Sequence, residues 1–74
     1  MLEKRSFSLS GHRTSVALEP EFWTALEAIA TRRGLLLLGL VTGLDARRAP
    51  DQKLASALRV FALHNIGQDS AAPF

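Results

Sequence analysis

The sequence predicts a mostly α-helical domain with one short β-strand near its N-terminus. Residues 13–18 alternate between an apolar and a polar face, as a half-buried strand requires. The two faces are Thr14, Val16 and Leu18, and Arg13, Ser15 and Ala17. Pro20 ends this strand and suits the first position of a helix. Beyond it lie three segments with helix-like apolar patterns, separated by Gly34 and by a polar connection around Pro50.

Composition limits the chain to one small domain. It has 74 residues, a net charge of +2 and no cysteine, which excludes disulfides and thiolate metal sites. No apolar run approaches the ~20 residues that cross a bilayer, and no signal peptide is evident. We therefore expect a cytoplasmic protein without a membrane partner. The pI is near 9.9, which is compatible with an anionic partner such as nucleic acid.

The segment before Gly11 alternates weakly, with Phe7 and Leu9 opposed to serines. Residues 1–10 are expected to form an N-terminal arm or an extra extended segment. Three alternatives remain open: the segment pairs with the following strand, continues it, or stays a flexible arm. The main domain is expected over residues 11–66, and residues 67–74 as a disordered tail.

The first helix is predicted over residues 20–33. Its apolar stripe consists of Phe22, Trp23, Leu26, Ile29 and Ala30, at helical spacing. Gly34 is a natural left-handed stop.

Two further helices are predicted over residues 35–44 and 52–66. The first carries no charge, so it should be buried on nearly every side. A chain this small cannot enclose it, which favours a partner subunit. The second has two apolar faces, with Leu54, Leu58, Phe61 and Ala62 on one and Val60 and Leu63 toward the other, and therefore needs two neighbours.

We expect no enzymatic activity and no cofactor. His12 and His64 have no partner at metal-ligand spacing, and the carboxylates belong to a capping turn and a helix surface. A binding function is better placed on the strand, because a lone strand leaves unpaired edges. Pairing with the same strand of a second copy gives an intermolecular antiparallel two-stranded ribbon, which fits the major groove of DNA.

The strand and helices resemble the ribbon-helix-helix (Arc/MetJ-type) superfamily. The residues that carry the resemblance are Arg13-Thr14-Ser15-Val16-Ala17-Leu18-Glu19 leading into Phe22-Trp23, and Leu54-Ala55-Ser56-Ala57-Leu58-Arg59-Val60-Phe61. More narrowly, the chain resembles a group of short bacterial proteins with ribbon-helix-helix domains. This resemblance covers about residues 4–66. It implies an intertwined homodimer that binds double-stranded operator DNA as a transcriptional repressor or autoregulator.

The resemblance also implies which residues contact DNA. The outward strand positions fall on Arg13, Ser15 and Ala17. Independently of the resemblance, the basic residues His12, Arg32, Arg33 and Arg5 are further candidates for DNA contact. Arg32 and Arg33 otherwise complement the dipole of the first helix, and Arg5 otherwise belongs to a solvated terminus.

Two features depart from the superfamily pattern. Ala17 cannot hydrogen-bond a base, and Leu35 and Leu36 stand where a phosphate-binding serine or threonine is common. The second helix of the superfamily corresponds to residues 35–44 or, alternatively, to residues 52–66; we favour the first because Gly34 stands where the superfamily turn belongs. The alternative function is a homodimeric protein-interaction module, antitoxin-like or an adaptor, with little affinity for DNA.

Overall fold

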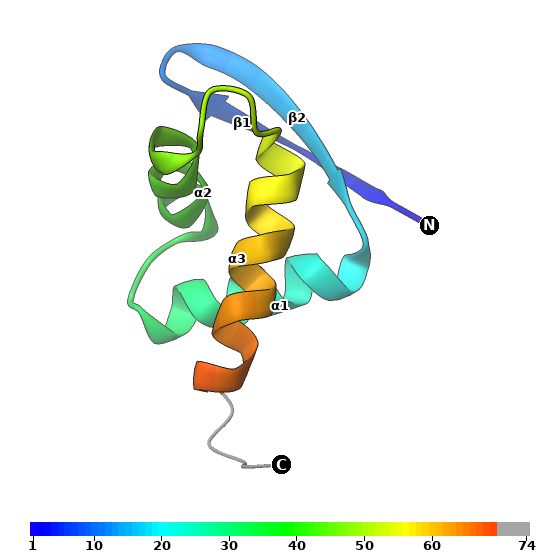
Figure 1. Ribbon diagram of the computed structural model, residues 1–74, viewed down its shortest axis with the longest axis vertical. Coiled ribbons are helices and arrows are strands. Elements are labelled where there is room, and N and C mark those ends of the chain that lie inside the picture. The colour runs from blue at the N-terminus through cyan, green and yellow to red at the C-terminus, as the bar shows by residue number, and fades with distance from the viewer. Residues whose placement is uncertain (70–74) are drawn as a thin grey trace.

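The computed structural model describes residues 1–69, and for residues 66–69 only the backbone. Two strands are followed by three helices (Figure 1). The elements are β1 (Glu3–Leu9), β2 (His12–Leu18), α1 (Pro20–Arg32), α2 (Leu37–Arg47) and α3 (Leu54–Asp69). No helix within the described residues is long and apolar enough to cross a membrane.

The two strands form an antiparallel hairpin within one chain. Leu9 faces His12, and the register continues to Glu3 facing Leu18. The loop is only Ser10 and Gly11, with φ angles of 51° and 80°. Positive φ at both positions is the signature of a type I′ turn, whose twist suits paired strands.

This hairpin corrects the expectation of a single strand. Of the three alternatives for the N-terminal segment, the structure shows pairing with the strand that follows. The physical reason is burial, since Phe7 and Leu9 lie in the core beside Val16 and Leu18. The predicted faces of β2 are confirmed, because Val16 and Leu18 are buried while Arg13 and Ser15 are exposed.

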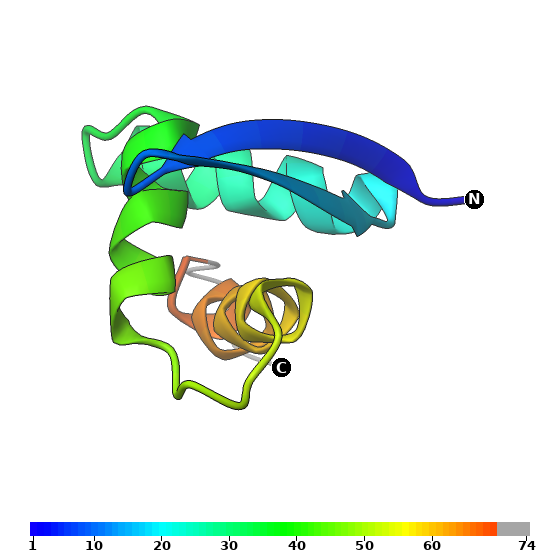
Figure 2. The ribbon, with the colours of Figure 1, turned by 90° about the horizontal axis from the view of Figure 1, so that it is seen from above.

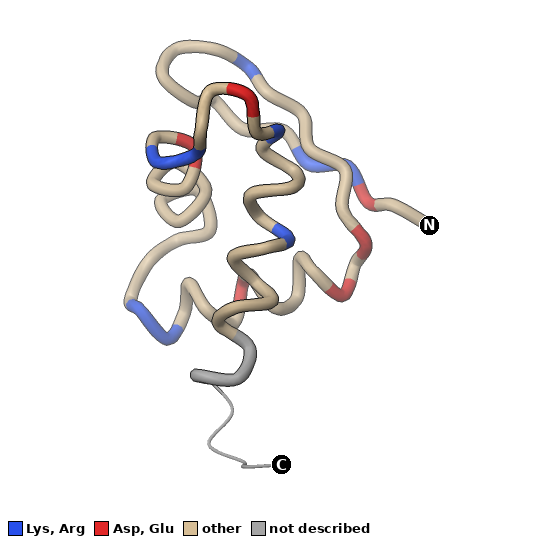
Figure 3. The backbone as a smooth tube through the Cα atoms, viewed as in Figure 1, with Lys and Arg blue, Asp and Glu red and all other residues tan. Residues whose placement is uncertain are grey.

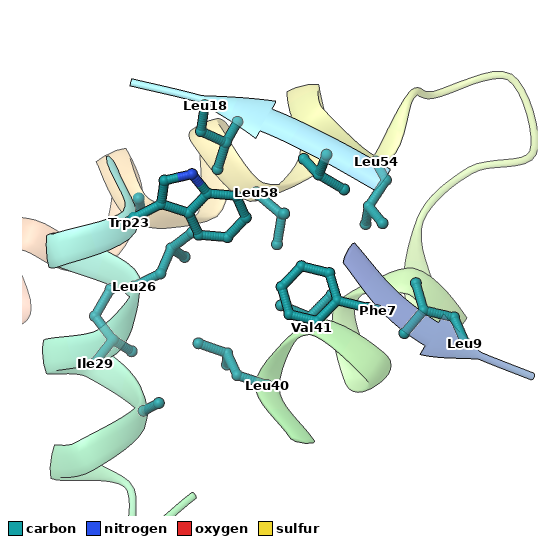
Figure 4. Close-up of a cluster of buried hydrophobic side chains, with 13 residues drawn as sticks. Phe7, Leu9, Leu18, Trp23, Leu26, Ile29, Leu40, Val41, Leu54 and Leu58 are labelled. Atoms are coloured by element: carbon teal, nitrogen blue, oxygen red, sulfur yellow. The ribbon is translucent and has the colours of Figure 1, made fainter. Parts of the chain in front are cut away.

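The hairpin covers one side of the helices (Figure 2). The core contains side chains from all five elements, with Trp23, Leu26 and Leu58 at its centre (Figure 4). The Trp23 ring lies 5.9 Å from that of Phe7, and its indole Nε1–H donates to the carbonyl oxygen of Glu3 at 2.8 Å. Trp23 thus ties α1 to the first residue of the hairpin.

Helix α1 and its end agree closely with the prediction. The expected stripe is buried at Trp23, Leu26, Ile29 and Ala30. Gly34 has φ 70°, and the amide of Leu35 donates to the carbonyl of Ala30 at 2.8 Å. This is a Schellman ending, for which glycine is preferred.

Helix α2 differs from the prediction in bounds and in burial. It begins two residues later than expected and continues three residues further, to Arg47. Only Leu40 and Val41 are buried, whereas Leu36 is 82% exposed and Leu38 is 47% exposed. The expectation of burial on nearly every side is therefore wrong for the single chain, because α1, α3 and β1 cover only part of α2.

Helix α3 confirms the prediction of two apolar faces. Leu54, Leu58 and Ala62 are buried, whereas Val60 and Leu63 are 43% and 66% exposed. The helix starts two residues later than expected and continues three residues further, to Asp69; the tail over residues 67–74 stays a prediction. Residues 70–74 of that tail lie outside the described residues.

Candidate nucleic-acid interface

The outward side of the hairpin is the candidate interface. Side chains alternate across a strand, and the register places six of them on the side away from the helices. This ribbon face consists of Lys4, Ser6, Ser8, Arg13, Ser15 and Ala17. It has two cations, three hydroxyls and no carboxylate, and all but the half-buried Ala17 are exposed. Basic positions are visible on both strands (Figure 3).

Two hydroxyls at the centre of the ribbon face are hydrogen-bonded to each other. Ser6 and Ser15 are cross-strand partners, and their Oγ atoms lie 3.0 Å apart. Either oxygen can be the donor. The side chain of Arg13, by contrast, makes no ion pair with any side chain that the structure describes, and its guanidinium is available to an anion or a base edge.

The backbone of the same residues faces the open edges of the hairpin. In a two-residue hairpin the closing pair, Leu9 and His12 here, exchanges hydrogen bonds, and pairs alternate from there. The amides and carbonyls of Arg13, Ser15 and Ala17 consequently point away from β1. They have no hydrogen-bond partner among the described residues.

A groove runs along this open edge of β2. Its volume is about 450 Å³, and it lies between residues 14–17 and the start of α3. Pro50, Lys53 and Leu54 form part of the opposite wall. The edge of β2 is therefore accessible to another extended chain.

Arg5 lies on the inner side of the hairpin, opposite to the ribbon face. Its Nε is 2.7 Å from Glu3 and its Nη1 is 3.3 Å from Glu27, while its guanidinium carbon lies 4.9 Å from the centre of the Trp23 ring. The hydrogen bond to Glu3 raises the pKa of Arg5 above its ordinary value. These contacts give Arg5 a role in holding β1 against α1.

The other sequence-predicted residues lie elsewhere. His12 precedes Arg13 at the turn end of β2, on the opposite side of the hairpin from the ribbon face. Arg33 donates to Asn65 at 2.7 Å and lies 5.2 Å from the ring centre of Phe61. Arg32 occupies the last turn of α1 and Arg33 its C-cap, so neither belongs to the ribbon face.

Sequence reasoning missed Lys4, Ser6 and Ser8 as parts of one surface with Arg13 and Ser15. The signal was present, because serines alternate with apolar residues before the two-residue Ser10-Gly11 loop. Within the described residues, no cluster of three or more histidines and carboxylates is arranged to hold a metal ion.

Comparison with known proteins identifies a family and a similar structure. Residues 2–66 match the sequence model of a family described as "Ribbon-helix-helix domain". The fold is similar to that of an uncharacterized protein from Bordetella pertussis Tohama I, with a TM-score of 0.74 and 33% sequence identity. The match covers 92% of this chain but only 58% of that one. No curated protein sequence matches the chain.

Proposed function

Since this chain belongs to the ribbon-helix-helix domain family, we propose that it is a DNA-binding transcriptional regulator that reads the major groove with its ribbon face. Members of the family generally bind DNA and dimerise, and they are typically regulatory and not enzymatic. The observation that carries the proposal is the outward side of the hairpin, which is cationic, rich in hydroxyls and free of carboxylates. A repressor or autoregulator acting in the cytoplasm is the expected role.

The dimensions and chemistry of the ribbon face suit the major groove. Paired strands lie about 4.8 Å apart, so a two-stranded ribbon fits a groove about 12 Å wide. Arg13 is suited to guanine or phosphate, the serines to several base edges and Ala17 to a thymine methyl group. Lys4, at the far end of the ribbon face, is suited to a phosphate.

Dimerisation is proposed to join two copies through the open edges of β2. The edge of β1 is flanked by the charged residues Glu3 and Lys4, a common protection against pairing, whereas β2 has only Arg13 and His12 at its turn end. Full antiparallel overlap of two β2 strands places Ser15 opposite Ser15 of the second copy and Arg13 opposite Ala17. No like charges face each other in this register.

The resulting sheet has the order β1-β2-β2-β1. Its two central strands repeat Arg13, Ser15 and Ala17, as the sequence predicted for an intermolecular ribbon. Four strands are wider than the groove, so the central pair enters it most deeply. Because neighbouring strands rotate by about 20–25°, each β1 strand turns toward a groove rim and carries Lys4 to the phosphates.

DNA binding is tested by fluorescence anisotropy with mixed-sequence duplexes over a range of salt concentrations. Affinity should fall steeply as salt increases. Arg13→Ala should weaken binding by about 1–3 kcal/mol. The matched control is Arg47→Ala, which removes the same charge from an exposed position at the end of α2 and should change affinity much less. Equal losses in the two variants would contradict a reading role for the ribbon face.

The dimer interface is tested with single-cysteine variants, which are unambiguous because the chain has no cysteine. Cα atoms of an opposed hydrogen-bonded pair lie about 5.5 Å apart, within the range of a disulfide. Ser15→Cys should therefore form a covalent dimer on oxidation, whereas the control Ser6→Cys, on β1, should not. Cross-linking of Ser6→Cys alone would place the interface at β1.

A protein-interaction module is the second candidate function. The observation that favours it is the exposure of Leu35, Leu36 and Leu38 at the start of α2, since exposed apolar patches often mark protein interfaces. Absence of duplex binding at low salt would favour this candidate over DNA recognition.

A further inference from the structure

We infer that the hydrogen-bonded hydroxyls of Ser6 and Ser15 act together as an adenine-reading pair, in which each hydroxyl orients the other and both contact the base. This inference rests on the proposed function and adds the base preference of the ribbon face. It gives β1, a strand that the sequence predicts only as an arm or an extra segment, a part in specificity.

The hydrogen bond between Ser6 and Ser15 limits the donors and acceptors that the two hydroxyls can present to a base. The two Oγ atoms lie 3.0 Å apart, on exposed side chains of residues that are directly opposite each other in the two strands. A serine hydroxyl has one hydrogen and two lone pairs. One of the two hydrogens is used between Ser6 and Ser15, so the pair has one free O–H donor, and the donating oxygen keeps its acceptor lone pairs.

One donor and one acceptor side by side match adenine. In the major groove adenine presents an N7 acceptor beside an N6 amino donor, whereas guanine presents two acceptors, N7 and O6. The serine pair can hydrogen-bond both groups of adenine but donates to only one of the two on guanine. It thus offers the same combination of groups as the asparagine or glutamine amide that commonly reads adenine.

The position of the pair supports contact with bases. Ser6 and Ser15 occupy the middle of their strands, with Lys4 and Ala17 on one side and Ser8 and Arg13 on the other. No carboxylate on the ribbon face competes for the free donor. In the proposed dimer Ser15 lies at the two-fold axis, so the two serine pairs are expected to favour adenines placed symmetrically about the centre of the operator.

Without Ser6, the Ser15 hydroxyl is free to rotate. A lone serine bonds to either donors or acceptors on bases, so Ser6→Ala should retain binding while losing discrimination. Ser6→Thr keeps a hydroxyl on a residue suited to strands, so this variant should discriminate between bases as the wild type does. Ser56→Ala is the matched control, because Ser56 is an exposed serine on α3 that lies outside the ribbon face.

The experiment selects preferred duplexes from a random library with the wild-type protein. Affinities are then measured for the selected duplex and for versions with each central adenine replaced by guanine. We expect the wild type, Ser6→Thr and Ser56→Ala to prefer adenine by about tenfold, and Ser6→Ala to lose most of this preference. Circular dichroism checks that every variant is folded.

The outcomes separate this inference from the proposed function. If the wild type selects DNA but Ser6→Ala keeps the same adenine preference, the serine pair is structural and the inference fails alone. A wild-type preference for guanine at the positions that Ser6→Ala changes also overturns it. If the wild type binds no duplex at low salt, the proposed function fails and the inference fails with it.

Discussion

Helix α2 begins without a side-chain cap, and Leu36→Ser is expected to supply one. Leu36 occupies the N-cap position with extended backbone angles of φ −77° and ψ 155°, and no side chain caps the helix. The first helical hydrogen bond joins the amide of Leu40 to the carbonyl of Leu36 at 3.1 Å. The amides of residues 37–39 therefore have no acceptor within the helix.

The size of the effect follows from the position of Leu36. A serine at the N-cap accepts a hydrogen bond from the second or third helical amide, those of Leu38 and Gly39, and is worth about 1 kcal/mol over alanine. Leu36 is 82% exposed, so its removal exposes little apolar surface in a single chain. In a domain of this size 1 kcal/mol raises the melting temperature by about 4–8 °C.

The assay is denaturant unfolding of wild type, Leu36→Ser and Leu36→Ala at one protein concentration. The serine variant should be more stable than the alanine variant by about 1 kcal/mol whatever covers Leu36, because both lack the leucine. The alanine variant then reports on burial. It should match the wild type if Leu36 faces water, and be less stable by about 1.5–3 kcal/mol if a second copy covers it. Equal stability of the serine and alanine variants would refute the capping argument.

Three other substitutions test the core, the hairpin and the acid side of the stability curve. Leu58→Ala should lower the free energy of unfolding by about 2–5 kcal/mol because Leu58 is fully buried. Leu63→Ala, at an exposed position of the same helix, should lower it far less. Comparable losses of stability would show that Leu63 is covered in solution. Gly11→Ala should destabilise the hairpin by about 1 kcal/mol, measured by thermal melting, since Gly11 has φ 80° and left-handed backbone is costly for alanine; an unchanged melting temperature would contradict the type I′ turn. The pKa of Glu19 is lowered from its ordinary value of 4.5, first by a hydrogen bond from the backbone amide of Glu19 and then by the guanidinium of Arg59. The ionised Glu19 carboxylate therefore stabilises the fold above pH 4.5, and this stabilisation is lost as the pH falls through the lower pKa of the folded state. Glu19→Gln should therefore flatten the loss of stability in acid, and an unaltered pH profile would exclude this contribution.

Local patterns were sufficient to predict β2, α1 and the turn between α1 and α2. The two faces of β2 follow from strict alternation, and the stripe of α1 follows from helical spacing. Gly34 was predictable for a steric reason, because its left-handed φ of 70° suits glycine best. Each of these features depends on residues close together in the sequence.

The pairing of β1 and the exposure of α2 depend on contacts that local patterns do not contain. Residues 3–9 alternate only weakly because Arg5 occupies an inward position, where it packs over Trp23 and pairs with Glu27. Such an arginine is indistinguishable from a surface residue until its distant partners are known. The helix bounds near residues 36 and 53 were also shifted, since neither N-cap residue, Leu36 nor Lys53, has a capping side chain.

The hairpin changes what a second copy must provide. A lone strand needs a partner merely to complete a ribbon, but here β1 already pairs with β2 along its whole length. Several apolar side chains that remain exposed lie away from the ribbon face: Leu36 and Leu38 at the start of α2, and Val60 and Leu63 on α3. Pairing of two β2 edges supplies backbone hydrogen bonds but does not by itself bury these side chains. If Ser15→Cys cross-links while Leu36→Ala and Leu63→Ala leave stability unchanged, strand pairing alone holds the dimer; losses in both would indicate a second, helical contact between copies.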